Sequence, residues 1–178
     1  MSARTVLQEA DITRALTRIA HEILESNRGA ENLVLLGIPT RGVTLAERLG
    51  HVISGIAQVA VPVGALDVTL FRDDLAKNPT RAPQPTHIPP GGIDGRTVVL
   101  VDDVLFSGRS IRAALDALQA IGRPGVVRLA ILVDRGHREL PIRPDFVGKN
   151  IPSSRLERVN VRLWENDDEE FVSIEEAR

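Results

Sequence analysis

Residues 98–110 read Val98-Val99-Leu100-Val101-Asp102-Asp103-Val104-Leu105-Phe106-Ser107-Gly108-Arg109-Ser110. The first four are apolar and three are valine, a pattern typical of a buried parallel strand. Two adjacent carboxylates follow, at the predicted end of that strand. The chain then turns into a helix whose apolar residues recur at helical spacing, namely Ile111, Ala114, Leu115 and Leu118. The stretch predicts a strand, a loop and a helix in direct succession.

The loop between this strand and helix is predicted to bind an anion. Free N–H groups at the start of a helix and the helix dipole both favour negative charge there. Ser107 and Ser110 can add hydroxyl donors, while Asp102 and Asp103 suit sugar hydroxyls or a Mg²⁺ ion. A ligand with a phosphate and a ribose diol would use all of these groups. The alternative is a plain polar turn, for which paired aspartates before Ser-Gly-x-Ser are unusual.

Composition narrows the class of protein. A length of 178 residues favours one domain, and 43% hydrophobic residues with only 3% aromatic residues favour an aliphatic core. Without cysteine, disulfides and thiolate metal sites are excluded, which fits a reducing cytoplasm. No apolar run reaches the length of a membrane span, and residues 1–4 show no signal-peptide pattern. Because the formal net charge is −2, a nucleic-acid surface would have to be a local patch.

A second strand, loop and helix come earlier in the chain. The apolar run 33–38 leads into Pro39-Thr40-Arg41-Gly42, where an arginine and a glycine stand at a possible second anion site. Strands that alternate with helices imply right-handed crossovers and a parallel sheet. Both loops are therefore expected at the carboxyl edge of that sheet, where open α/β folds bind ligands. Neither GxxxxGK[ST] nor GxGxxG occurs, which excludes the P-loop and dinucleotide types of loop.

Three other regions complete the pattern. Residues 12–28 predict an amphipathic helix with a polar face that, taken alone, is an ordinary solvated surface. Residues 78–92 carry five prolines, so they form neither helix nor central strand, and such a loop is functional or disordered. Further strands are expected at 59–71, 125–133 and 159–164, followed by an acidic C-terminal tail over about 165–178.

All thirteen positions of residues 98–110 resemble the phosphoribosyl pyrophosphate (PRPP) motif of type I phosphoribosyltransferases. Together with residues 14–22, 69–75 and 133–143, they resemble the PyrR family within that superfamily, from about Val6 to Trp164. The resemblance implies a single α/β phosphoribosyltransferase domain over residues 1–178. Such a domain has a central, mostly parallel sheet flanked by helices, a mobile flap over about 67–92 and a small hood.

The resemblance also implies function. The protein would convert uracil and PRPP to UMP and pyrophosphate with Mg²⁺. It would also bind the pyrimidine-operon messenger RNA leader when UMP or UTP is present, and so lower expression of pyrimidine biosynthesis genes. A homodimer or higher homo-oligomer without a membrane association is expected. A salvage phosphoribosyltransferase for another base, without an RNA role, is the alternative.

Roles for single residues follow from the same resemblance. Arg41 and Arg72 would stabilise the pyrophosphate leaving group, and Asp102 and Asp103 would hold the ribose hydroxyls, directly or with Mg²⁺. The loop at 39–42, often through a non-proline cis peptide, would hold pyrophosphate. The site for PRPP and nucleotide would comprise Thr40, Arg41, Gly42, Asp102, Asp103, Phe106, Ser107, Gly108, Arg109 and Ser110. The backbone near Val159 and Asn160 would read the uracil edge.

The base and the RNA have their own candidate residues. Phe106 stands where purine phosphoribosyltransferases of this type commonly carry an aspartate, and it cannot exchange a proton with a purine nitrogen. That departure favours a pyrimidine base. An RNA surface needs cations for phosphates and groups that contact exposed bases. The residues that match the family's RNA-site pattern are Thr17, Arg18, His21, Arg138, Arg143 and Lys149. Each of them, taken singly, would be an ordinary surface residue.

Overall fold

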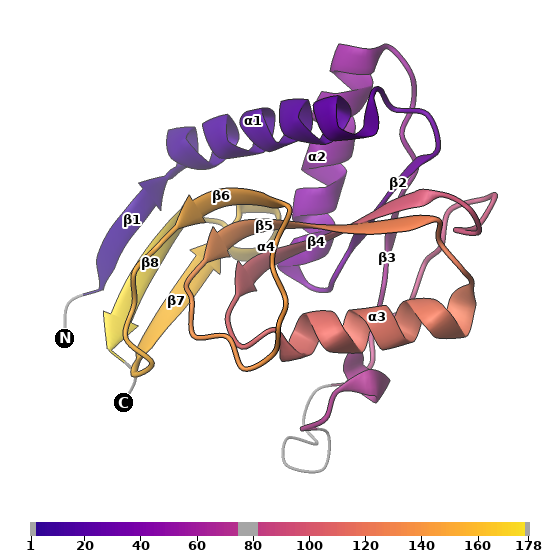
Figure 1. Ribbon diagram of the computed structural model, residues 1–178. Coiled ribbons are helices and arrows are strands. Elements are labelled where there is room, and N and C mark those ends of the chain that lie inside the picture. Colours follow the sequence, from indigo (N-terminus) through magenta and orange to yellow (C-terminus); the bar gives the residue numbers. More distant parts are fainter. Residues whose placement is uncertain (1–2, 75–81, 177–178) are drawn as a thin grey trace.

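The computed structural model describes residues 3–74 and 82–176, which form two sheets (Figure 1). The larger sheet has five parallel strands in the order β3-β2-β4-β5-β6. The smaller, the hood, is antiparallel in the order β1-β8-β7. The strands are β1 (Arg4–Gln8), β2 (Leu33–Gly37), β3 (Val63–Ala65), β4 (Thr97–Leu105), β5 (Val126–Asp134), β6 (Phe146–Asn150), β7 (Glu157–Arg162) and β8 (Phe171–Glu176). The predicted α/β architecture with a hood is confirmed.

Helices cover both faces of the parallel sheet. On one face lie α1 (Glu9–Asn27) and α2 (Arg41–Ala57), and on the other lie α3 (Arg109–Ile121) and a 3-10 turn at Thr69–Phe71 (Figure 1). Since successive residues of a strand point to opposite faces, Val99 and Val101 of β4 pack with α1 and α2, whereas Val98 and Leu100 pack with α3. No helix in the described ranges is long and apolar enough to cross a bilayer.

Helix α1 has the predicted buried stripe, made of Ile12, Ala15, Leu16, Ile19, Ala20 and Ile23. It begins three residues earlier than predicted, because the Asp11 carboxylate accepts the N–H of Gln8 at 2.8 Å and caps the first turn. Helix α3 buries Ile111, Ala114 and Leu118 as predicted. Leu115, predicted on the same stripe, is 40% exposed.

Strand β4 is longer than predicted, so Asp102 and Asp103 lie inside it and not at its end. The reason is the pairing of its neighbours. Strand β2 stops at Gly37, opposite Val101, but β5 continues to pair with β4 as far as Leu105. Beyond Val101, β4 has a neighbour on one side only among the described strands, and the loop after β2 lies on the open side.

The C-terminal residues do not form the acidic tail that was predicted. A four-residue helix, α4 (Trp164–Asp167), leads into β8, the central strand of the hood. Val172 and Ile174 of β8 are buried in the same core as α1 and α2. Acids on both sides of this short apolar alternation hid it in the sequence. Strands β1 and β6 were also not predicted. The pattern of β6 is weak because the strand ends in two exposed polar residues.

The predicted flap is only partly described, because residues 75–81 lie outside the described ranges. On its C-terminal side, Ala65 and His87 form an antiparallel bridge with N···O distances of 2.9 and 2.8 Å. Pro89 is buried. These contacts hold residues 87–89, in the C-terminal part of the predicted flap, against β3.

Candidate active site

The loop between β4 and α3 lines a cavity of about 220 Å³. The lining residues are Arg72, Asp73, Asp74, Asp102 and residues 104–111. Gly108 caps α3 with φ of 93°, a left-handed conformation that costs other residues about 1–2 kcal/mol. The first-turn amides of α3, which have no acceptor within the helix, start at this loop. The loop and the start of α3 thus line one cavity, and anion binding by residues 106–110 stays a prediction.

The segment after β5 holds the carbonyl groups of this loop. Glu139 donates its N–H to the Ser107 carbonyl at 2.9 Å, and Arg138 donates Nη1 to the Phe106 carbonyl at 2.9 Å. Arg138 also donates Nη2 to the Asp134 carboxylate at 2.5 Å. Arg138, predicted as an RNA contact, is thus half-buried and holds the loop at residues 106–110, called the phosphate loop below after the role expected for it. This role could not be seen in the sequence, since the partners lie in different elements.

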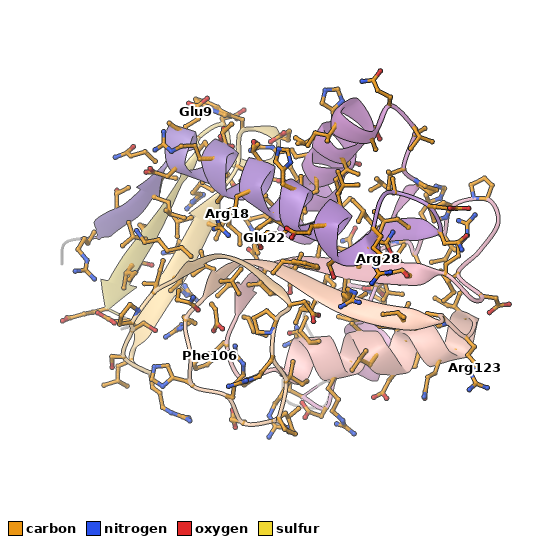
Figure 2. The ribbon with its side chains drawn as sticks, turned by 45° about the horizontal axis from the view of Figure 1, so that its top comes forward. Glu9, Arg18, Glu22, Arg28, Phe106 and Arg123 are labelled. Carbon is orange, nitrogen blue, oxygen red and sulfur yellow. The ribbon has the colours of Figure 1, made fainter. Side chains whose placement is uncertain are left out.

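Phe106 is covered by the same segment. The guanidinium of Arg135 lies 4.3 Å from the centroid of the Phe106 ring, and His137 meets the ring edge-on at 5.9 Å. Arg135 is only 8% exposed, and burial lowers its pKa. Its Nη2 donates to the carbonyls of Ser154 and Glu157 at 2.7 Å. Figure 2 shows Phe106 beside the start of α3. Sequence reasoning missed the Arg135 contact.

The loop after β2 reaches the same region from the other side of β4. Its Pro39–Thr40 peptide is cis, as the resemblance implies. Gly42 packs directly on β4, because a Cβ atom there would lie 2.5 Å from the Val101 carbonyl oxygen and 3.3 Å from Oδ1 of Asp102. A glycine is required for this approach, which places the predicted pyrophosphate loop next to the first of the two acids.

The two acids serve different sides of β4. Asp102 lines the cavity, whereas Asp103 lies near enough to Arg41 to help raise the pKa of that guanidinium. Each carboxylate accepts the next backbone N–H, at 2.9 Å for Asp102 and 2.8 Å for Asp103. The described residues include no cluster of three or more metal-ligating side chains. Two half-buried carboxylates beside an anion loop nevertheless fit a Mg²⁺ ion that a diphosphate also binds.

Arg41 is paired with an acid that sequence reasoning did not single out. Its Nε and Nη2 lie 3.0 and 2.5 Å from the two oxygens of Asp167 in α4. This hydrogen bonding raises the pKa of Arg41 and lowers that of Asp167. Next to it, Arg48 of α2 binds Glu165 at 2.6 Å and Glu170 at 2.5 Å. The acidic residues around α4 therefore fasten the hood to α2 (Figure 1).

Arg72 and Arg109 stand at the mouth of the cavity with acidic partners. Arg72 lines the cavity and binds Asp74 through Nε at 3.0 Å. Arg109 binds Asp73 at 2.5 Å and Glu139 at 3.6 Å, and the Asp73 carboxylate raises its pKa. The segment before residue 75 is thereby connected to the phosphate loop.

The predicted base-reading residues are not part of this cavity. Val159 and Asn160 lie in β7, where they pair with Ile174 and Ser173 of β8. Neither lines the 220 Å³ cavity. Both are half-buried, so their reading of a uracil edge stays a prediction.

The candidate RNA residues lie on α1, on β6 and in the segment between β5 and β6. Thr17, Arg18 and His21 are exposed on α1, and Arg18 donates to the backbone carbonyls of Val147 and Gly148 at 3.1 and 2.6 Å (Figure 2). Lys149 is exposed on β6 itself, and Arg143 lines an open hollow of about 630 Å³. Val147 also lines that hollow, so the α1 face and the hollow adjoin.

Comparison with known proteins agrees with this geometry. Residues 2–163 match the family model described as phosphoribosyl transferase domain. The chain is 68% identical to Bifunctional protein PyrR of Leifsonia xyli subsp. xyli, over 99% of both chains. It is 63% identical to the protein of the same name from Streptomyces coelicolor, over 97% of this chain and 89% of that relative.

Solved structures share the fold at low identity. A hypoxanthine phosphoribosyltransferase of Trypanosoma cruzi has a TM-score of 0.73 at 18% identity, covering 98% of this chain and 91% of that one. A hypoxanthine-guanine phosphoribosyltransferase of Bacillus anthracis has a TM-score of 0.72 at 15% identity, covering 97% and 98%. These two likenesses concern the fold, whereas the sequence identities decide the family. The chain belongs to the PyrR family of phosphoribosyltransferases.

Proposed function

We propose that the protein transfers the phosphoribosyl group of PRPP to uracil, forming UMP and pyrophosphate, and that it binds the pyrimidine-operon leader RNA in response to UMP or UTP. One observation carries the proposal. Asp102, the phosphate loop 106–110 and Arg72 line a single cavity at the carboxyl edge of the parallel sheet. Together they match the ribose, the 5′-phosphate and the pyrophosphate of one ligand.

The reaction breaks the bond from the anomeric carbon to pyrophosphate and forms a bond to uracil N1, whose proton is released to solvent. Positive charge grows on the sugar and negative charge on the leaving group, so the site needs charges of both signs. Residues 107–110 anchor the 5′-phosphate through helix-start amides and hydroxyls. Asp102 and Asp103 accept the ribose hydroxyls, and Arg41 and Arg72 bind the leaving diphosphate. Bound Mg²⁺ would add neutralisation of the diphosphate, held by one of the two acids, Asp102 or Asp103.

Phe106 favours a pyrimidine. The Arg135 guanidinium stacked on it and the hydrophobic ring leave that position without a carboxylate for a purine nitrogen. Catalysis at this site is mainly positioning and charge stabilisation, because no side chain needs to act as a nucleophile.

The RNA function rests on the surface along β6. Arg143 and Lys149 are exposed cations able to contact phosphates, and Thr17 and His21 on α1 offer groups for exposed bases. The 630 Å³ hollow, which Arg143 and Val147 help to line, has room for a splayed nucleotide. We further propose a homodimer or larger homo-oligomer in the cytoplasm, with light scattering as the measurement of its size.

Two assays on one preparation test the proposal. With Mg²⁺, uracil and PRPP should yield UMP and pyrophosphate, and a gel shift of the operon leader should strengthen when UMP is added. Turnover of another base in place of uracil, with no RNA shift, would instead support a salvage enzyme. Absence of both activities would refute the proposal.

A further inference from the structure

The Arg41 guanidinium, at the start of α2, is held by an acid 126 residues further along the chain. The Asp167 carboxylate accepts from Nε at 3.0 Å and from Nη2 at 2.5 Å, and neither Asp167 nor Arg41 is among the residues that line the 220 Å³ cavity. We propose that Asp167 is a positioning residue, which fixes the orientation of Arg41 toward the pyrophosphate group of PRPP. This inference rests on the proposed function and adds a residue to it.

The geometry allows Arg41 to bind both groups at once. A guanidinium carries five N–H donors in a planar fork. Asp167 occupies one edge of the fork, through one N–H on each of two nitrogens. Both N–H groups of Nη1 and the second one of Nη2 point away from the carboxylate. Because the Arg41 side chain is 32% exposed, that second edge can meet an anion.

Asp167 is itself rigidly placed. Its side chain is 6% exposed, and its Oδ2 accepts the N–H of Leu163 at 2.9 Å. Arg162 of β7 approaches Oδ1 at 3.6 Å. The turn is also fixed to α2 through Thr44, which donates Oγ1–H to Asn166 at 2.8 Å. A guanidinium held by a fixed partner loses less conformational freedom when it binds a ligand, and this preorganisation raises affinity.

The same contact has an opposite interpretation. The Asp167 carboxylate could compete with pyrophosphate for Arg41 and so weaken PRPP binding. The two roles predict opposite signs for removal of the carboxylate charge. Positioning predicts weaker PRPP binding, and competition predicts tighter binding.

The test is the variant Asp167→Asn, which keeps an acceptor for Leu163 but removes the charge that orients Arg41. PRPP binding with Mg²⁺, measured by calorimetry, should weaken about tenfold, the scale of one charge-assisted hydrogen bond. In turnover, the KM for PRPP should rise while the KM for uracil stays unchanged. In an Arg41→Gln background, Asp167→Asn should have no further effect.

Two matched controls separate positioning from loss of structure. Asp168→Asn removes the same charge one residue away, at an exposed position whose φ of 56° suits asparagine, and should leave PRPP binding unchanged. Glu165→Gln weakens the neighbouring pair with Arg48 and should lower the melting temperature without changing the KM for PRPP.

The outcomes are distinct. PRPP binding by Asp167→Asn that equals or exceeds that of the parent chain would overturn the inference. An equal loss of PRPP binding in Glu165→Gln would also overturn the inference, because PRPP binding would then depend on the general contact between α2 and the residues around α4 and not on Asp167. If the parent chain binds PRPP but does not convert uracil, the proposed function fails. The calorimetry then still decides the role of Asp167.

Discussion

Asp102 and Asp103 are consecutive residues of a strand, so their side chains point to opposite sides of β4. One lines the cavity with the phosphate loop and the other acts on Arg41. A pair of this kind can hold two hydroxyls or a hydroxyl and a metal ion. Their adjacency in the sequence therefore carries more information than a cluster of acids elsewhere in the chain.

We expect Asp102→Asn and Asp103→Asn each to lower turnover by about 10- to 100-fold, since each removes a charged acceptor worth about 1.5–3 kcal/mol. Steady-state rates with saturating uracil measure the effect. Melting curves control for folding, because both side chains also accept a backbone N–H that asparagine can still bind. Near-normal rates in both variants would refute the assignment of the motif.

Base choice tests Phe106. Uracil should be a substrate, and hypoxanthine and guanine should not, because the ring under Arg135 offers a purine nitrogen no proton acceptor. Product formation from each base under identical conditions is the measurement. A purine rate comparable with the uracil rate would show that another residue supplies the missing group.

Single residues also show where sequence reasoning ends. The strand, loop and helix around residues 106–110 could be predicted because they are contiguous, so local spacing fixes their geometry. The pairs of Arg41 with Asp167 and of Arg138 with the Phe106 carbonyl could not, because each joins segments distant in the chain. In the sequence, Asp167 is one of several acids in residues 165–170, and Arg138 is one of several cations in residues 135–149, so neither stands out from its neighbours.

Among the secondary-structure elements, β6 joins the α1 face to the hollow beside the phosphate loop. It was not predicted, because five residues with a polar end give a weak strand pattern. Strand β8 was missed for a related reason, since only packing against α1 and α2 reveals its apolar side. Long periodic elements such as α1 were found, whereas short strands depend on partners that the sequence does not display.

The surface along β6 yields a prediction for RNA. Arg143→Gln and Lys149→Gln should each weaken binding of the operon leader and flatten its salt dependence by about 0.7 in log–log slope per lost contact. Uracil turnover should persist. Arg123→Gln is the matched control, because Arg123 is an exposed cation far from Phe106, just beyond the C-terminal end of α3 (Figure 2).

Equal losses in all three variants would mean nonspecific charge attraction and would contradict a site at β6. Arg18 and Arg138 are poor choices for this test. Their guanidinium groups hold backbone carbonyls of β6 and of the phosphate loop, so their removal changes structure as well as charge.

The α4 turn predicts how stability depends on pH. Hydrogen bonding to Arg41 lowers the pKa of Asp167 in the folded protein, so this pair stabilises the fold at neutral pH. The contribution is complete above the ordinary aspartate pKa of about 4 and is lost as pH falls through the lower folded value. Urea unfolding of the parent and Asp167→Asn should differ most at pH 7 and converge in acid. A difference independent of pH would contradict the assignment.

At the scale of the whole molecule, one parallel sheet serves two functions at neighbouring places. The phosphate loop comes directly after β4 in the chain, and the surface proposed for RNA lies along β6. Residues 134–138 lie between these two places. Arg138 contacts the loop carbonyl and also lines the hollow. A nucleotide bound at the loop would therefore lie next to a residue that borders the surface proposed for RNA. If the nucleotide raises the affinity for RNA by some factor, thermodynamic linkage requires that RNA raise the affinity for the nucleotide by the same factor.

The central claim is that the catalytic site is also the nucleotide sensor. Its most direct test is the affinity for the operon leader RNA with and without UMP, in the parent chain and in Asp103→Asn. The account predicts that UMP tightens RNA binding by the parent chain. It also predicts that Asp103→Asn binds RNA normally without nucleotide but no longer responds to UMP. A full UMP response in Asp103→Asn would contradict it, because the sensor would then lie elsewhere.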